Sequence, residues 1–217
     1  MKQADISVEL IDYMGDDLSV VNAARVSFDK EASYSDFDGA SLPERDQKLI
    51  NYLAKHNHWS PFAHTSLQFR IKAPIFVARQ LGKHQVGLVW NEVSRRYVDD
   101  EPEFYIPKEW RGRPENAKQG SSGVVDADCE AFNNVVGHCL WMYEDLLKDG
   151  VAPEQARMVL PQNTMTSWIW TGSLMAFARV YKQRIDPHAQ YESQIVAKLI
   201  NDNIPRLFKH SWKALTE

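Results

Sequence analysis

The sequence predicts an α/β protein in which helices pack around a mainly antiparallel sheet. Apolar and polar residues alternate over 6–10 and 67–72, and a tryptophan-rich apolar run covers 164–171. A period of two is typical of a half-buried strand, and a short apolar run fits a buried one. Residues 126–149 instead repeat apolar side chains at helical spacing. The chain of 217 residues fits a single domain, 1–217.

A short helix should follow the first strand. Asp16 and Asp17 can cap it, and it runs through Arg25 with apolar residues on one side. Two interpretations of Arg25 stay open, a structural turn or contact with a ligand. Residues 29–40 are polar and aromatic without periodicity, so we expect a surface loop.

Two further helices are marked by their ends. Ser41 and Glu44 have the spacing of a capping box, which begins a helix that ends near His56. After the strand over 67–72, a proline begins a helix over 75–81 and Gly82 stops it. The most basic stretch of the chain, residues 79–97, therefore follows a strand and a helix, and these two elements can hold it rigidly.

The second half of the chain is mostly helical. Gly150 suits the position just after the long helix, and a short helix lies between Pro153 and Pro161. Ser173 opens the next helix, and Asp186 followed by a proline predicts the start of the last one that we assign.

Residues 108–125 lack periodicity and are rich in Gly, Pro, Ser and charge. They are either a linker or a flexible flap over a binding site.

Composition excludes several classes of protein. The net charge is −4, and no apolar run approaches the ~20 residues that span a bilayer. The first residues, MKQADISVEL, lack the apolar core of a signal peptide. Cys129 and Cys139 give neither a disulfide framework nor a metal-binding spacing. We therefore expect a cytoplasmic protein with no membrane partner and no nucleic-acid partner.

Clustered histidines raise the question of a metal. His56, His58 and His64 lie close together, but no set of carboxylates accompanies them, and zinc sites have firmer spacing. We expect no metal site. A metal-dependent nucleotide hydrolase that uses these histidines or His84 stays open as the less favoured alternative.

The chemistry concentrates in residues 79–97, which read RQLGKHQVGLVWNEVSRRY. This stretch is dense in cations although the whole chain is acidic, and Glu92 is its one acid. Ser94 places a hydroxyl beside two guanidinium groups, which suits a phosphate. Trp90 and Tyr97 can stack on a flat ring. A solvated basic face is the simpler interpretation, but the aromatic and amide side chains favour a nucleotide site.

This stretch resembles the signature of the flavin-dependent thymidylate synthases. In that family an Arg-His-Arg triplet precedes a short spacer and Asn-Glu-x-Ser-x-Arg-Tyr. Here the triplet is Lys-His-Gln at 83–85, the spacer is one residue longer, and the second motif runs over 91–97. Arg157, the Arg-x-x-x-x-Ala-Gln-x-Glu pattern from Arg184, and the Ala-Arg-Val-Ser-Phe run at 24–28 also match, in the family's order.

The resemblance implies a fold, a reaction and an assembly. The fold is that of the thymidylate synthase-complementing proteins. The reaction is reductive methylation of dUMP to dTMP, with methylenetetrahydrofolate as the carbon donor and FAD, reduced by NADPH, as the source of hydride. Several subunits of a homotetramer share each active site in that family.

The resemblance also implies residue roles. Arg184 and Ser94 are the expected catalytic residues, with Arg184 against the uracil. The residues expected to hold dUMP are Gln80, Lys83, Glu92, Ser94, Arg95, Arg96, Arg157 and Arg184. The residues expected to line FAD are His58, Ser60, Lys83, His84, Gln85, Asn91, Ser173, Arg179 and His188.

We find no evident base or cation that would activate either cysteine, so neither is a convincing nucleophile for C6 of the ring. That agrees with a route in which flavin carries the difficult chemistry. The substitutions at Lys83 and Gln85 keep a second alternative open, a nucleotide-binding protein that has lost flavin chemistry.

Overall fold

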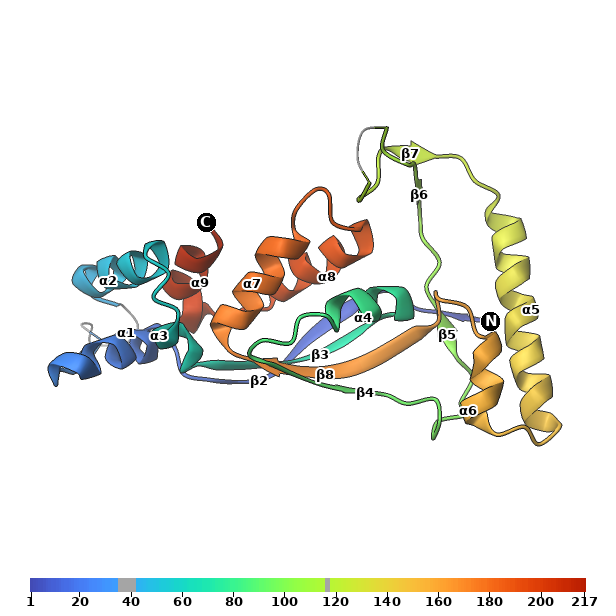
Figure 1. The fold of residues 1–217 in the computed structure, drawn as a ribbon, viewed down its shortest axis with the longest axis horizontal. Coiled ribbons are helices and arrows are strands. Elements are labelled where there is room, and N and C mark those ends of the chain that lie inside the picture. The colour runs from blue at the N-terminus through green and yellow to red at the C-terminus, as the bar shows by residue number, and fades with distance from the viewer. Residues whose placement is uncertain (35–41, 116–117) are drawn as a thin grey trace.

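A four-stranded antiparallel sheet runs along the long axis of the molecule (Figure 1). The computed structural model describes residues 1–34, 42–115 and 118–217. Every neighbouring pair of strands in this sheet is antiparallel, which confirms the predicted fold class. In spatial order the strands are β2 (Ser7–Met14), β3 (Ser66–Pro74), β8 (Met165–Gly172) and β4 (Leu88–Glu92).

The strands bury one face of the sheet. In β3 the side chains of Leu67, Phe69 and Ile71 are fully buried, while the intervening polar side chains are not. Trp168 and Trp170 of β8 lie on the same buried side. Helices α4 (Ile75–Leu81), α7 (Leu174–Arg184) and α8 (Tyr191–Asp202) lie on one side of the sheet, and the other side carries no helix in the view (Figure 1).

Helices gather at the two ends of the sheet (Figure 1). One end carries a helical lobe made of α1 (Asp17–Arg25), α2 (Glu44–Lys55), α3 (Ser60–Ala63) and α9 (Lys209–Thr216). The other end carries an arm made of α5 (Cys129–Lys148) and α6 (Pro153–Ala156).

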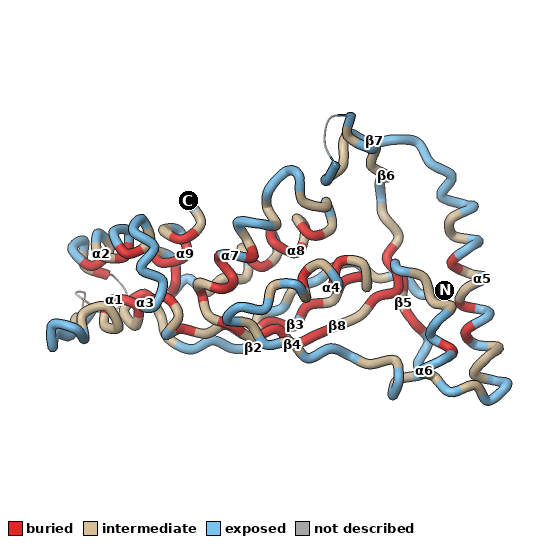
Figure 2. The backbone as a smooth tube through the Cα atoms, in the orientation of Figure 1, coloured by how far each residue is buried: buried red, intermediate tan, exposed pale blue. Residues whose placement is uncertain are grey.

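Burial differs between the two ends (Figure 2). The main core joins the sheet to the helical lobe and to α7 and α8. The arm has a much smaller core of Phe104, Val136 and Leu140. Val135 and Trp141 of α5 are 61% and 56% exposed, so part of the apolar surface of this long helix is not buried within the described chain.

The remaining elements are short. Two small sheets pair β1 with β5 and β6 with β7. Their strands are β1 (Lys2–Gln3), β5 (Glu103–Phe104), β6 (Trp110–Arg111) and β7 (Val124–Val125). The 3₁₀ turns among the described residues are η1 (Val26–Phe28), η2 (Arg157–Val159) and η3 (Arg206–Phe208). The β6–β7 pair belongs to the 108–125 segment, so its described parts fold back on themselves. Whether this segment acts as a flap stays a prediction.

Several predicted helix ends are confirmed. Asp16 caps α1, and Ser19 completes a capping box with it. Helix α4 spans the predicted 75–81 and ends at Gly82. Ser41, the predicted cap of α2, lies outside the described residues, and the structure begins that helix at Glu44.

Three other predictions need correction. Asp186 does not cap the last predicted helix, because its carboxylate accepts the N–H of His188 instead and α8 begins only at Tyr191. The helix after Pro153 narrows to a 3₁₀ turn from Arg157, before the predicted end. The middle of the 79–97 stretch contains an edge strand, β4, which we did not predict.

No helix among the described residues has both the length and the apolar character needed to cross a membrane.

Candidate functional site

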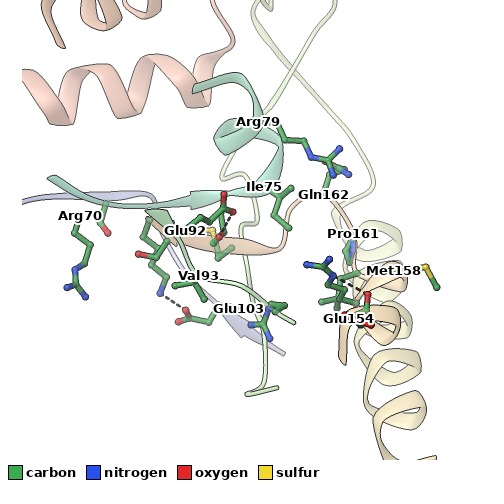
Figure 3. A pocket seen from close by; sticks show the side chains of 18 of the residues that line it. Arg70, Ile75, Arg79, Glu92, Val93, Glu103, Glu154, Met158, Pro161 and Gln162 are labelled. Atoms are coloured by element: carbon green, nitrogen blue, oxygen red, sulfur yellow. Dashed lines mark hydrogen bonds and ion pairs between the residues drawn. The ribbon is translucent and has the colours of Figure 1, made fainter. Parts of the chain in front are cut away.

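Two adjoining cavities lie where α4, β4 and the turn after α6 meet. The larger has a volume of about 950 Å³ and the smaller about 570 Å³. Ile75, Arg79, Glu92 and Arg157 line both of them. Figure 3 shows Arg79 extending from α4, Glu92 near the middle of the larger cavity, and Glu154 on the opposite wall. Because the two cavities share these residues, we treat them as one composite site.

Local structure places the shared residues. The chain turns at the end of β3 straight into α4, so Arg79 stands exposed in the last turn of that helix. The chain then reverses through Gly87, whose φ of +75° lies in the left-handed region that glycine tolerates best. The carbonyl of Gly87 accepts the N–H of Ser173, which holds this turn against the start of α7. Strand β4 follows and ends at Glu92.

Both oxygens of the Glu92 carboxylate already have a donor. Thr166 of β8 donates its hydroxyl to Oε1 at 2.7 Å, and the Trp90 indole N–H donates to Oε2 at 3.1 Å. Each carboxylate oxygen can accept more than one hydrogen bond. Glu92 is therefore fixed in orientation and still able to accept from a ligand.

Trp90 belongs to a cluster of tryptophans under the site. Its ring stacks on Trp168, with centroids 4.2 Å apart and an interplanar angle of 18°. It meets Trp170 edge to face at 5.4 Å. Trp90 also lines the smaller cavity, so the wall of that cavity is rigid and aromatic.

Arg184, at the end of α7, contacts the end of α4 and the turn that follows it. Its Nε donates to Nε2 of His84 at 2.9 Å, and one terminal nitrogen donates to the Gln80 carbonyl at 3.3 Å. Burial, with the charge of Arg184 as the smaller cause, lowers the pKa of His84. Burial also lowers the pKa of Arg184, which leaves the guanidinium charged at any pH of interest.

Most cations of the site lack a carboxylate partner, although Lys72 of the larger cavity pairs with Glu103. Arg157 donates to the backbone carbonyl of Glu154 and Arg95 to that of Asp100. Among the described residues, the cations of the predicted site and of the cavity walls without an ion pair are Arg70, Arg79, Lys83, Arg95, Arg96, Arg157, Arg179 and Arg184. Unneutralised guanidinium and ammonium groups in an acidic chain are typical of a site for a phosphorylated ligand.

The structure brings together only part of the predicted site. The predicted residues that line one or both cavities are Lys83, His84, Gln85, Glu92, Arg95 and Arg157. Gln80 and Arg184 join them through hydrogen bonds at the end of α4. Ser94 lies just beyond, where its hydroxyl accepts from the Arg96 guanidinium at 3.2 Å.

Other predicted residues lie away from the cavities in this single chain. Ser60 begins α3 of the helical lobe, and His58 lies just before it with its ring against Tyr52 of α2; both residues are exposed. His188 is exposed and contacts Asp186 through its ring. The predicted cofactor residues that also line neither cavity are Asn91, Ser173 and Arg179. The Ser173 hydroxyl caps α7 by accepting the Ala176 N–H.

Several lining residues were absent from the predicted roles, among them Arg79, Trp90 and Thr166. Arg79 precedes Gln80 in α4, and its place in the last helical turn was the available signal. Trp90 was recognised only as a ring able to stack. Thr166 carried no signal, because its contact with Glu92 depends on the pairing of β4 with β8.

The cysteines and histidines outside the site were also located. Cys129 begins α5, and its thiol accepts the Trp110 indole N–H, while Cys139 lies within the same helix. Neither sulfur lines either cavity. The rings of His56 and His58 are 6.3 Å apart, and no group of three or more His, Cys, Asp or Glu gathers as metal ligands in the described parts of the chain.

An antiparallel sheet under helices, with unpaired cations around a fixed carboxylate, is the arrangement expected of an enzyme that acts on an anionic small molecule. The chain belongs to the thymidylate synthase complementing protein family, whose model matches residues 9–208.

Known members of this family and solved structures agree with that assignment. A flavin-dependent thymidylate synthase of Kosmotoga olearia is 40% identical over 207 residues, which cover 91% of this chain and 86% of the relative. The enzyme of the same name from Thermus thermophilus is 38% identical, over 97% of this chain and 75% of the relative. The UMP/dUMP methylase PolB of Streptomyces cacaoi, bound with 5-Br dUMP, superposes with a TM-score of 0.84 at 30% identity. The superposition covers all of this chain and 97% of the PolB chain.

Proposed function

We propose that this protein is a flavin-dependent thymidylate synthase that methylates dUMP to dTMP. Methylenetetrahydrofolate is the carbon donor, FAD is the cofactor and NADPH is the reductant. The single observation that carries the proposal is the group of unpaired cations around Glu92, in a chain whose relatives and structural neighbour are named for this reaction.

The substrate phosphate belongs with the guanidinium groups. Ser94 and Arg96 already contact one another, so their hydroxyl and guanidinium form a ready set of donors, with Arg95 beside them. Arg157 extends this positive surface across the larger cavity. Glu92, held by its two donors, accepts from a hydroxyl or N–H of the nucleoside.

The base belongs against Arg184. A charged guanidinium beside the uracil stabilises the negative charge that develops on the ring as C5 becomes nucleophilic. Gln80, on the neighbouring helix, fixes Arg184 through its carbonyl. The role of the protein is to position substrates and stabilise charge, with Arg184 and Ser94 as the proposed catalytic residues.

We assign the flavin cofactor to the smaller cavity. Lys83 is exposed there and has no carboxylate partner among the described residues, and Arg79 and Arg157 stand on the same wall, which suits a pyrophosphate. Lys83, His84 and Gln85 would hold FAD from this chain. When bound, reduced flavin supplies the hydride for the methyl group. The Ser173 hydroxyl accepts the Ala176 N–H, which leaves its O–H donor and one lone pair for a ligand.

A homotetramer with shared sites accounts for the residues left outside the cavities. His58, Ser60, Arg179 and His188 are polar and lie away from both cavities, so they would serve a neighbouring subunit's site. The exposed Trp141 on α5 adds an apolar surface for such an assembly. We place the enzyme in the cytoplasm.

The absence of a thiol from the cavities supports a route without a cysteine nucleophile. The protein's own residues then bind, orient and polarise the base, and no covalent bond to the protein is needed.

A product assay tests the proposal. Protein incubated with dUMP, methylenetetrahydrofolate, FAD and NADPH should yield dTMP, identified by mass. A variant with Cys129→Ser and Cys139→Ser should retain turnover. No methylated nucleotide from wild-type protein contradicts the proposed function, and loss of turnover in a folded, ligand-binding double variant contradicts the route without a thiol.

UMP is a second candidate substrate, because the structural neighbour PolB is named a UMP/dUMP methylase. Parallel assays with UMP and dUMP, compared by kcat/KM, decide between one substrate and two.

A further inference from the structure

His84 contacts Arg184 directly, although the two residues are 100 positions apart. His84 lies in the turn after α4, and Arg184 is the last residue of α7. The Arg184 Nε donates to His84 Nε2 at 2.9 Å, and the Gln80 carbonyl accepts from a terminal nitrogen at 3.3 Å. These two acceptors hold one edge of the guanidinium. A guanidinium has five N–H donors, so the others remain for a substrate.

The second acceptor is fixed by the surrounding helices. The Gln80 side chain donates to Gln190, and its oxygen accepts from the hydroxyl of Ser193 at 3.2 Å. Ser193 of α8 is fully buried. The Gln80 carbonyl therefore belongs to a braced backbone, which leaves His84 as the one side-chain acceptor that a change of pH can remove.

The hydrogen bond requires a particular form of the imidazole. Nε2 accepts only when it carries no proton, so His84 must be neutral with its proton on Nδ1. Protonation would turn Nε2 into a donor and place two cations in contact. The charged groups that share the smaller cavity with His84 are Arg79, Lys83, Arg157 and Glu92.

Those surroundings favour the neutral form. Three of those side chains are positive and one is negative, and Arg184 adds a further positive charge from α7. The nearest ring, that of Trp170 in β8, has its centroid 6.5 Å away and carries no charge. On α8, the Glu192 carboxylate accepts a hydrogen bond from the side-chain amide of Gln190, not from the imidazole. Burial and Arg184 accordingly lower the pKa of His84.

We propose that His84 is the positioning residue for Arg184, and that its neutral imidazole aligns the guanidinium for the uracil. This inference rests on the proposed function, since it gives Arg184 its role there. It assigns His84 a task separate from its expected contact with the flavin. Acidification breaks the alignment, so kcat should fall with a single protonation while substrate binding, which depends mainly on phosphate contacts, changes less.

Two substitutions separate alignment from packing. The oxygen of Gln in His84→Gln can accept from Arg184 at every pH, whereas His84→Ala offers no acceptor. We expect His84→Ala to lower kcat by about 100-fold and His84→Gln to stay within about tenfold of wild type. The acid limb of the kcat profile that belongs to His84 should be absent in His84→Gln. Flavin content, measured by absorbance, separates a loss of cofactor from a loss of alignment.

A double-mutant cycle with Arg184→Ala adds an independent readout. Once Arg184 is gone, His84→Ala should cost little more, because the losses of coupled residues do not add. Fully additive losses, or the same acid limb in wild type and His84→Gln, would overturn the proposal.

The hydrogen bond is also measurable without turnover. Imidazole ¹⁵N NMR of the wild-type protein, assigned with His84→Gln, should show the Nδ1–H form. Its pKa should rise in Arg184→Ala and stay unchanged in the control Lys182→Ala, which removes an exposed charge from the same helix. An Nε2–H form would overturn the proposal. If wild-type protein makes no methylated product, the proposed function fails, while this measurement still decides whether His84 holds Arg184.

Discussion

Charge is handled differently in the helical lobe and in the composite site. In the lobe, Asp17 and Asp46 are buried, and both have partners within the chain. Asp17 accepts the backbone N–H groups of His210 and Ser211, each at 2.8 Å, and Asp46 pairs with Arg25. Around the two cavities, Lys72 pairs with Glu103, but Arg79, Lys83 and Arg157 have no ion pair among the described residues.

The difference separates stability from activity. A buried carboxylate whose partners are inside the chain contributes to folding, and its loss leaves those partners unsatisfied. A cation whose partner would be a ligand contributes little to the free energy of unfolding of the ligand-free chain. Substitutions in the lobe should therefore lower the free energy of unfolding, and substitutions in the site should lower turnover.

The largest expected effect is on activity. Arg184→Ala should lower tritium release from 5-tritiated dUMP by about 1,000-fold, because a charge-stabilising donor is lost from the transition state. The melting temperature should change little. Lys182→Ala, on the same helix, is the matched control and should behave as wild type. Near-normal release from Arg184→Ala would remove this residue from its proposed role.

A smaller effect, on stability alone, is expected from Asp46→Ala. Breaking the pair leaves the largely buried Arg25 uncompensated, at a cost of about 3 kcal/mol in urea unfolding. Activity per folded molecule should be unchanged. Glu44→Ala, which removes an exposed i,i+4 partner of Lys48, should cost only about 0.3 kcal/mol. Equal costs at the two positions would break the comparison between buried and exposed charge.

The smallest effect concerns pH. Burial raises the pKa of Asp17 above its ordinary value of 3.8. Between the pKa of Asp17 in the unfolded state and its higher pKa in the folded state, the folded protein binds more protons than the unfolded protein. The contribution of Asp17 to the free energy of unfolding therefore falls as pH rises through this range. Asp17→Asn has no such titration but loses one acceptor, at about 1 kcal/mol. The free energy of unfolding, measured for wild type and for Asp17→Asn, should change in favour of the variant as pH rises from about 3.8. A difference between the two proteins that does not change with pH would contradict this sign.

Local signals predicted the local structure well. Helix α4 is bounded by a proline and Gly82, and the capping box at Asp16 is a short-range pattern. The signal failed where a residue had a competing partner. Asp186 looked like a helix cap, but its carboxylate accepts the N–H of His188, and the helix starts later.

Contacts between segments far apart in the chain could not be predicted from the sequence. The pairing of β4 with β8 brings Thr166 to Glu92, and nothing in either segment alone specifies that register. The partners of Asp17 lie 193 and 194 positions along the chain. The motif resemblance predicted which residues matter for dUMP and FAD, and these roles remain proposals. The bond between His84 and Arg184 required the fold.

The stacked tryptophans give the enzyme an internal optical probe. Trp90 lines the smaller cavity while its other neighbours, Trp168 and Trp170, are buried beneath it. A conjugated ring entering beside Trp90 would take up excitation energy from all three indoles. Occupancy of the cavity can thus be followed by quenching of intrinsic emission, without attaching a dye to the protein.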